Sequence, residues 1–158
     1  MAVPEWKKFE DAVQKLFETR AETERLIYHR FYDTHSAQGF LPAQPGDHLV
    51  IWHGVPVLIE TKYSSRLSSL YSCFSEMVKS HQIGSHRLWL RAGAQTMIAF
   101  KGTDGYELWD GAHCVECRSE GKRLNKDTRL KVGGSLPDLF RNVEIPCPNR
   151  YRKIYLFD

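Results

Sequence analysis

The chain of 158 residues contains few cysteines, no long apolar run and no internal repeat. Its four cysteines are too sparse for a disulfide framework in a chain that is long enough to build its own core, so we expect a reducing, cytoplasmic setting. No stretch reaches the about 18 consecutive apolar residues that a membrane helix needs, and the first residues lack an apolar run of signal-peptide length. We therefore expect neither membrane spanning nor secretion.

The composition indicates an ordinary globular domain. Hydrophobic residues make up 42% of the chain and charged residues 26%, values typical of a soluble globular protein. There is no low-complexity linker, and the length suits one domain, since domains of about 100–150 residues are the commonest. We expect a single domain over residues 1–158. A net charge of +3 permits a polyanionic partner but does not require one, because clustering of charge matters more than its sum.

The first half of the chain alternates between helical and extended hydrophobic periods. Apolar residues such as Phe9, Val13 and Phe17 recur at helical spacing and predict an amphipathic helix. Two later β-rich runs are separated by Gly54 alone, so we expect them to form an antiparallel hairpin. The expected elements of this half are a helix over residues 4–24, a strand over 25–32, a loop over 33–46, and strands over 47–53 and 55–63.

The second half continues the alternation. Apolar residues from Leu67 to Val78 follow the helical spacing closely, with Ser64 or Ser65 available as a cap, and predict a continuous helix. The remaining expected elements are a helix over residues 80–94 that ends at Gly93 despite Gly84, strands over 96–101 and 106–110, a basic loop over 121–134, a short helix over 135–143 capped by Ser135, and a closing strand over 153–157. Together these elements predict an α/β domain with a central sheet flanked by helices.

Two carboxylates and an amine interrupt the apolar hairpin. Because strand side chains alternate, Glu60 and Lys62 project to one face and Thr61 to the other. The hairpin can bring Asp47 beside them, and carboxylate oxygens are hard ligands that suit Mg²⁺. The alternative is structural: a salt bridge between Glu60 and Lys62, with Asp47 as an Asx-turn residue.

The context of this triplet resembles a known nuclease signature. Pro-Gly-Asp at residues 45–47 precedes a strand, a hairpin follows, and an apolar run leads into Glu60-Thr61-Lys62. An amphipathic helix that ends in Ser80-His81-Gln82 comes next, followed by Gly93 and the strand that begins at Thr96. This pattern resembles the PD-(D/E)xK nuclease superfamily, and within it the RecU and archaeal Hjc types of Holliday junction resolvase, particularly small phage-encoded relatives. The resemblance covers a core of about residues 5–109 and leaves an extension over 110–158 unmatched.

The resemblance implies a restriction-endonuclease-like core with a central mixed β-sheet flanked by α-helices. It implies that Asp47, Glu60 and the main-chain carbonyl of Thr61 bind Mg²⁺, for which Mn²⁺ can substitute. Lys62 would position the attacking water or stabilise charge on the phosphate. Relatives add an acidic residue from the first helix, for which we select Glu10, with Glu18 as the alternative.

Several residues near this motif are candidates for DNA binding. Gln82 matches a helix glutamine that lies close to the active site in relatives, although it could equally be a plain exposed amide. His81 beside it is the histidine best placed to touch substrate. Arg66 and Lys79 flank the helix expected after Lys62, and the basic residue Arg30 lies on the preceding strand.

Two further features lie beyond the core. A basic stretch, and a basic tail after it, could bind phosphates without reading sequence, or could be solvated charge. "HCVEC" at residues 113–117 has a CxxC pair but no second pair at zinc-finger spacing, so ordinary strand cysteines are favoured over structural zinc. The basic residues are Lys122, Arg123, Lys126, Arg129 and Lys131 in the stretch, and Arg141, Arg150, Arg152 and Lys153 in the tail.

The resemblance therefore implies a Mg²⁺-dependent, structure-selective DNA endonuclease that resolves four-way junctions by paired nicks. Because such a junction has approximate two-fold symmetry, we expect a homodimer, acting in the host cytoplasm if the protein is phage-encoded. Two alternatives remain open. The same nuclease core could act on flaps, forks or duplex DNA, or the protein could be a catalytically silent nucleic-acid-binding protein.

Overall fold

The structure is a computed structural model that describes residues 2–31, 44–145 and 154–156. Within these residues, no helix has both the length and the apolar character needed to cross a membrane. The elements in chain order are α1 (Glu5–Thr23), β1 (Leu26–Arg30), β2 (His48–Trp52), β3 (Val55–Tyr63), the 3₁₀ turn η2 (Leu70–Ser72), α2 (Phe74–Met77), α3 (Ser80–Arg91), β4 (Gln95–Gly102), β5 (Gly105–Asp110), α4 (Gly111–Glu120), the 3₁₀ turn η3 (Lys126–Thr128), β6 (Arg129–Gly133), α5 (Leu136–Phe140), β7 (Val143–Ile145) and β8 (Ile154–Leu156).

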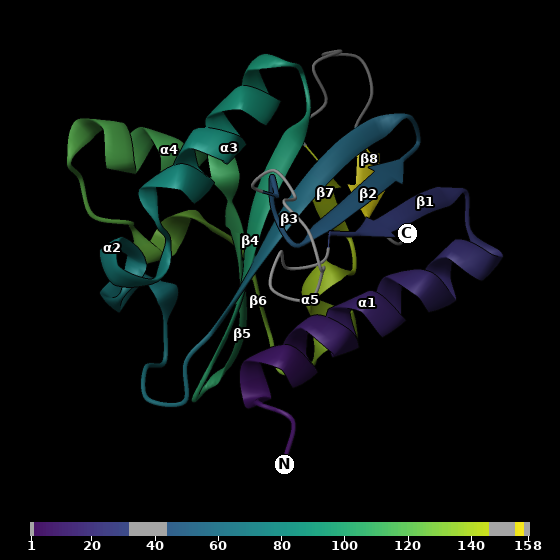
Figure 1. Cartoon of the computed structure of the whole chain (residues 1–158), viewed down its shortest axis with the longest axis horizontal. Helices are drawn as coiled ribbons and strands as arrows, with labels where there is room; N and C mark the ends of the chain where they lie inside the picture. Colours follow the sequence, from purple (N-terminus) through teal and green to yellow (C-terminus); the bar gives the residue numbers. More distant parts are fainter. Residues whose placement is uncertain (1, 32–43, 146–153, 157–158) are drawn as a thin grey trace, which may run out of the picture.

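Six strands form one mixed sheet in the order β1-β2-β3-β4-β5-β6, and β7 pairs with β8 in a separate hairpin. Strands β3 and β4 are parallel, with α3 in the crossover between them, and the other pairs of the six-stranded sheet are antiparallel. Figure 1 shows α3 and α4 on one side of this sheet and α1 with α5 on the other. The predicted α/β class, a central mixed sheet flanked by helices, is confirmed.

The β2–β3 hairpin fixes the register of the functional strand. His53 and Gly54 both have positive φ, 48° and 81°, which is the backbone of a two-residue type I′ turn. The turn sets Trp52 opposite Val55 and His48 opposite Ile59. The predicted antiparallel hairpin is confirmed, and its short turn holds the start of β2 beside the second half of β3.

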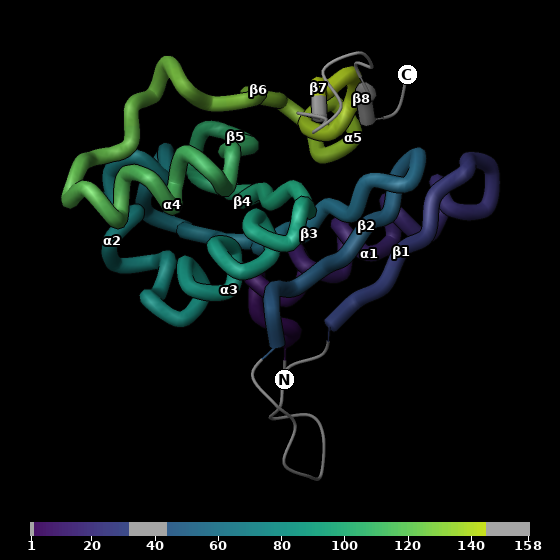
Figure 2. Tube along the Cα trace, turned by 90° about the horizontal axis from the view of Figure 1, so that it is seen from above, coloured from purple at the N-terminus to yellow at the C-terminus, as the bar shows by residue number. Residues whose placement is uncertain are grey.

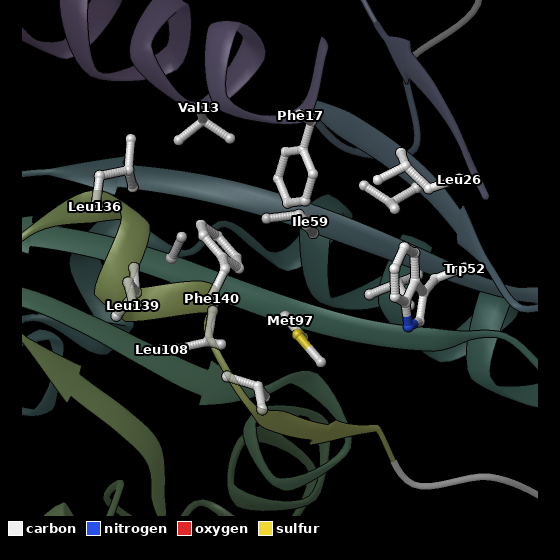
Figure 3. Packing of buried hydrophobic residues seen from close by; sticks show 14 of the residues in the cluster. Val13, Phe17, Leu26, Trp52, Ile59, Met97, Leu108, Leu136, Leu139 and Phe140 are labelled. Carbon is white, nitrogen blue, oxygen red and sulfur yellow. The ribbon is translucent and has the colours of Figure 1, made fainter. Parts of the chain in front are cut away.

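Each face of the sheet has its own hydrophobic core. Alternate residues of β3, β4 and β5 pack under α1 and α5, where Ile59, Met97 and Leu108 meet Phe17 and Phe140 (Figure 3). The residues between them point to the other face and pack against α2, α3 and α4. The second core includes Ile98, Phe100, Trp109, Cys114 and Cys117. Figure 2 shows the same arrangement from above, with α3 and α4 near each other and α5 apart from them.

The continuous helix predicted from Leu67 to Val78 is wrong. The structure has η2 and the four-residue α2 instead, and the chain is extended at Val78. Ser69 caps the 3₁₀ turn, and the buried carboxylate of Glu107 accepts hydrogen bonds from the Ser69 hydroxyl and the Leu70 amide. These hydrogen bonds to Glu107 of β5 hold Ser69 and Leu70 at the start of the 3₁₀ turn, although the apolar spacing of the segment is that of an α-helix.

Two predictions for the extension are also wrong. The cysteines of "HCVEC" lie on helix α4, which Asp110 caps at its start through the Ala112 amide. Gly121 ends this helix in the left-handed conformation, at φ 65°. The basic stretch is not a loop throughout, because β6 occupies residues 129–133 and pairs with β5.

The other predicted elements within the described residues are present. The bounds differ from the expected ones by at most three residues in α1, α3, α5, β1, β4, β5 and β8. Ser135 caps α5 as predicted. Most of the predicted loop over 33–46, and the basic residues Arg150, Arg152 and Lys153 with Cys147, lie outside the described residues.

Candidate active site

The site lies where β3 extends beyond β2. The last backbone pair between the two strands is His48 with Ile59, followed by a hydrogen bond of 3.2 Å from the Asp47 amide to the Ile59 carbonyl. Beyond this point the side chain of Asp47 continues the ladder, because its Oδ2 accepts from the Thr61 amide at 2.7 Å and from the Thr61 hydroxyl at 2.6 Å. The Asp47 carboxylate is thereby held at the open edge of β3.

The same geometry orients the carbonyl of Thr61. In an antiparallel ladder the N–H and C=O of a hydrogen-bonded residue point to the same neighbouring strand. The Thr61 amide points to Asp47, so its carbonyl also faces the side of β3 that β2 has left. A main-chain oxygen and the Asp47 carboxylate therefore face one edge.

Glu60 lies on the opposite face of β3 from Thr61 and is only 2% exposed. Lys62 donates to its Oε1 at 2.6 Å, and the side-chain amide of Gln82 on α3 donates to the same oxygen. Burial raises the pKa of Glu60 to about 7, with a further contribution from the Asp47 carboxylate that the Lys62 ammonium opposes. The ionised form of Glu60 is therefore costly unless further positive charge compensates it.

The side chain of Gln82 is fixed at both ends. Its Oε1 accepts from the Lys79 amide at 2.9 Å, at the start of α3, and its Nε2 donates to Glu60. The first contact determines which end of the amide faces the site, since the oxygen is already used at the helix end. The alternative of a plain exposed amide is wrong, because Gln82 joins α3 to β3.

Helix α1, which packs on the face of the sheet opposite to α3, adds the carboxylate of Glu10. Burial raises the pKa of Glu10 to about 7, and the next contribution is the nearby Asp47 carboxylate, which places the two acids close together. Arg30 opposes this shift and donates to Glu10 Oε2 at 3.0 Å. Glu18 is instead exposed and accepts from Gln14 at 2.7 Å. Of the two predicted acids of the first helix, Glu10 is the one whose pKa the Asp47 carboxylate raises.

The candidate DNA-binding residues differ in their surroundings. The Arg30 guanidinium binds Asp11 at 2.6 Å and Gln14 at 2.5 Å in addition to Glu10, so its charge already meets acidic groups of α1. Arg66, Lys79 and His81 have exposed side chains along the connection between β3 and α3 and at the start of α3. Their contacts with DNA remain predictions.

Two buried histidines adjoin the site, and sequence reasoning assigned them no role. His48 is fully buried and its Nδ1 lies 2.7 Å from the Tyr28 hydroxyl. His86 is fully buried on α3, and neither ring nitrogen has a hydrogen-bond partner in the described part of the chain. Burial lowers the pKa of His86 to about 4, and the Lys62 ammonium adds to the shift. The available signal was spacing, since His86 follows Gln82 by one helical turn.

The donors at this edge fit a hard divalent cation. Asp47 and Glu60 each use one carboxylate oxygen within the protein, Oδ2 and Oε1, and no donor bonds the other oxygen among the described residues. Mg²⁺ in enzymes is usually held by one or two carboxylates, with waters and substrate phosphates completing its shell. No group of three or more His, Cys, Asp or Glu side chains in the described ranges is arranged to hold a metal by itself. Asp47 and Glu60 supply two oxygen donors of the kind that Mg²⁺ takes, and any further ligands would come from water or a substrate.

Several chains of solved structures match this one. The chain is similar to Hjc of Archaeoglobus fulgidus, a Holliday junction resolvase from an archaeal hyperthermophile, with a TM-score of 0.43 and 14% sequence identity over 68% of this chain and 76% of that one. No family model matches the chain, and no curated protein matches it.

Proposed function

We propose that this protein is a Mg²⁺-dependent DNA endonuclease that cleaves four-way junctions. The support comes from hydrogen bonds on adjoining residues of β3: Asp47 binds Thr61, and Lys62 and Gln82 both bind the buried Glu60. Helix α1 contributes Glu10, whose pKa the Asp47 carboxylate helps to raise. The sequence from Pro45 to Gln82 resembles the PD-(D/E)xK signature, and the element order from α1 to β5 agrees with the core that this signature implies.

The proposed site residues have distinct tasks. Asp47, Glu60 and the Thr61 carbonyl would hold the cation, which would supply electrostatic stabilisation of charge on the phosphate. Lys62 would align the attacking water and stabilise the phosphate charge. The water oxygen forms the new bond to phosphorus, the bond to the 3′ oxygen breaks, and the products carry a 5′-phosphate and a 3′-hydroxyl. Arg30 would hold Glu10 in place.

The choice of a four-way junction follows from the resemblance to resolvases, and a homodimer follows from the substrate, because two symmetric nicks need two sites at a fixed separation. The same site could serve a nuclease for flaps, forks or duplex DNA. The ion pair between Lys62 and Glu60 is also the contact that the structural alternative required. Only cleavage separates these possibilities.

The test is cleavage of matched synthetic substrates with and without Mg²⁺. A four-way junction, a flap, a fork and a linear duplex of the same sequence are incubated with the protein, and the products are mapped on each strand. We expect paired, symmetric nicks in the junction that require Mg²⁺ or Mn²⁺ and stop with EDTA. Equal cleavage of linear duplex would contradict the choice of substrate.

A matched variant pair identifies the site. Lys62→Met keeps the length of the side chain and removes its charge, so it should bind the junction and fail to cut it. Lys15→Met makes the same change on the exposed face of α1 and should cut like the wild-type protein. Unchanged cleavage by Lys62→Met would overturn the proposed site, and binding without cleavage by the wild-type protein would indicate a silent binding protein.

A further inference from the structure

The extension beyond β5 packs against the connection between β3 and α3, which we define as residues 64–79. On α4, Arg118 donates to the Val78 carbonyl at 2.7 Å, and its guanidinium lies 5.0 Å from the centre of the Phe74 ring. On β6, Arg129 binds Glu107 at 2.8 Å, and Glu107 in turn holds the Leu70 amide. Arg118 and Arg129 thus fasten the extension to the segment that leads from Lys62 to Gln82.

A third contact between these segments lies at the surface. The ammonium of Lys126 in η3 lies 5.3 Å from the centre of the Tyr71 ring, and Tyr71 is 37% exposed. A cation over an aromatic face is attracted by the ring and is held in place by it. Lys126 is therefore a positioned surface charge that spans the connection and the extension.

The basic residues of the stretch 121–131 divide into two groups. Three of them are engaged by the protein: Lys122 with Glu120 at 2.5 Å, Arg129 with Glu107, and Lys131 with the Arg141 carbonyl. Arg123 and Lys126 are exposed and have no carboxylate partner among the described residues. The charge that remains available to a partner is concentrated on these two side chains.

We propose that Arg123 and Lys126, with the Tyr71 ring beneath Lys126, form a second DNA contact that binds the sugar–phosphate backbone of a duplex arm flanking the cleaved position. Neither charge has a carboxylate partner in the part of the chain that the structure describes, and both lie on a segment that Arg118 and Arg129 fasten. A fixed charge of this kind suits phosphates, which need position but no base recognition. The connection, which carries Tyr71, begins two residues after the site residue Lys62. The inference rests on the proposed function for its choice of DNA as partner.

The test is the salt dependence of junction binding, measured by fluorescence anisotropy in EDTA so that no cleavage occurs. The variant is Arg123→Ala with Lys126→Ala, and the matched control is Lys7→Ala with Lys15→Ala on the exposed face of α1. Each phosphate contact contributes roughly 0.9 to the slope of log affinity against log salt, so the variant should lose about two from the wild-type slope. The control should keep the wild-type slope, and a thermal melt verifies that each protein is folded.

The outcomes separate this inference from the proposed function. A wild-type slope in the Arg123 and Lys126 variant would overturn the second contact and leave the nuclease proposal intact if cleavage occurs. Binding with the expected loss of slope, but no cleavage by the wild-type protein, would overturn the nuclease proposal and keep the contact. An equal loss of slope in the control would also overturn the contact, since it would show that charge anywhere on the surface acts alike. Failure of the wild-type protein to bind any DNA would overturn both.

Discussion

Glu60 on β3 and Glu107 on β5 are buried glutamates of the same sheet, on two strands that β4 separates. They differ in how many of their carboxylate oxygens accept hydrogen bonds. They are 2% and 3% exposed, and each forms an ion pair. The two donors to Glu60 both reach Oε1. The donors to Glu107 use both oxygens and are the Ser69 hydroxyl, the Leu70 amide, the Trp109 indole and the Arg129 guanidinium.

The surroundings differ in charge as well. Glu60 shares its region with the carboxylates of Asp47 and Glu10, which raise its pKa in addition to burial. Glu107 joins β5, β6 and the connection between β3 and α3 into one hydrogen-bonded network. A buried carboxylate with complete hydrogen bonding stabilises a fold, whereas one placed beside like charges with an oxygen left over is destabilising unless a ligand compensates it. The first description fits Glu107 and the second fits Glu60.

The largest expected effect is on catalysis, from Glu60→Gln. The substitution removes the carboxylate that the proposed cation needs, and we expect cleavage to fall by roughly a thousandfold. The folded protein should become more stable at neutral pH, because a costly buried charge is removed. Cleavage rates and urea unfolding without metal measure the two effects. Lower stability together with intact cleavage would mean that Glu60 is structural.

Glu107→Gln should lower the stability of the protein and leave cleavage nearly unchanged, the opposite of what we expect for Glu60→Gln. One carboxylate oxygen is replaced by an amide NH2 group, which donates and cannot accept, so donors such as Trp109 or Arg129 lose their acceptor. We expect a loss of about 3 kcal/mol in the free energy of unfolding, as is typical when one partner of a buried pair is removed. Urea unfolding measures this loss, and cleavage below the unfolding transition should remain within a few-fold of wild type. An unaltered free energy of unfolding would contradict the structural role.

The sequence predicts the surroundings of Glu60 much better than those of Glu107. The reason is the separation along the chain of the residues that make the contacts. Strand alternation and a two-residue turn are local properties, and they place Asp47, Glu60 and Lys62 at one edge without knowledge of the rest of the chain. Glu107 acts on Ser69, 38 residues earlier, and no local pattern encodes that contact. The helix predicted over the connection is wrong for this reason.

Some of the features that the sequence predictions missed could have been found from local sequence signals, and others could not. Asp110 before α4 and Gly121 after it are the usual residues for the start and end of a helix, so α4 could have been predicted from its caps. The choice between Glu10 and Glu18 could not, because helical periodicity allows either to face the sheet and the packing of α1 decides. The partners of Arg30 on α1 also depend on that packing.

The pH dependence of stability sharpens the comparison. The pKa of Glu60 is about 7 in the folded protein against 4.5 for an ordinary glutamate, so the folded state binds more protons between these values and Glu60 lowers stability as pH rises through them. The stability gained by Glu60→Gln should therefore be small near pH 4.5 and reach its full size above about pH 7. Urea unfolding in EDTA at both ends of this range, with Glu18→Gln as control, measures the difference. A gain that does not change with pH would contradict the raised pKa.

The smallest expected effect concerns His86, a fully buried histidine of α3. Its ring nitrogens lack partners among the described residues, so His86→Leu removes two buried polar atoms and should raise the free energy of unfolding by about 1 kcal/mol. The pKa of His86 is lowered from 6.5 to about 4, so the folded state binds fewer protons than the unfolded chain in this range and His86 lowers stability as pH falls. The gain from His86→Leu should accordingly increase toward acid, opposite to the gain from Glu60→Gln. A loss of stability at neutral pH would instead mean that the imidazole is hydrogen-bonded in solution, for example through a buried water.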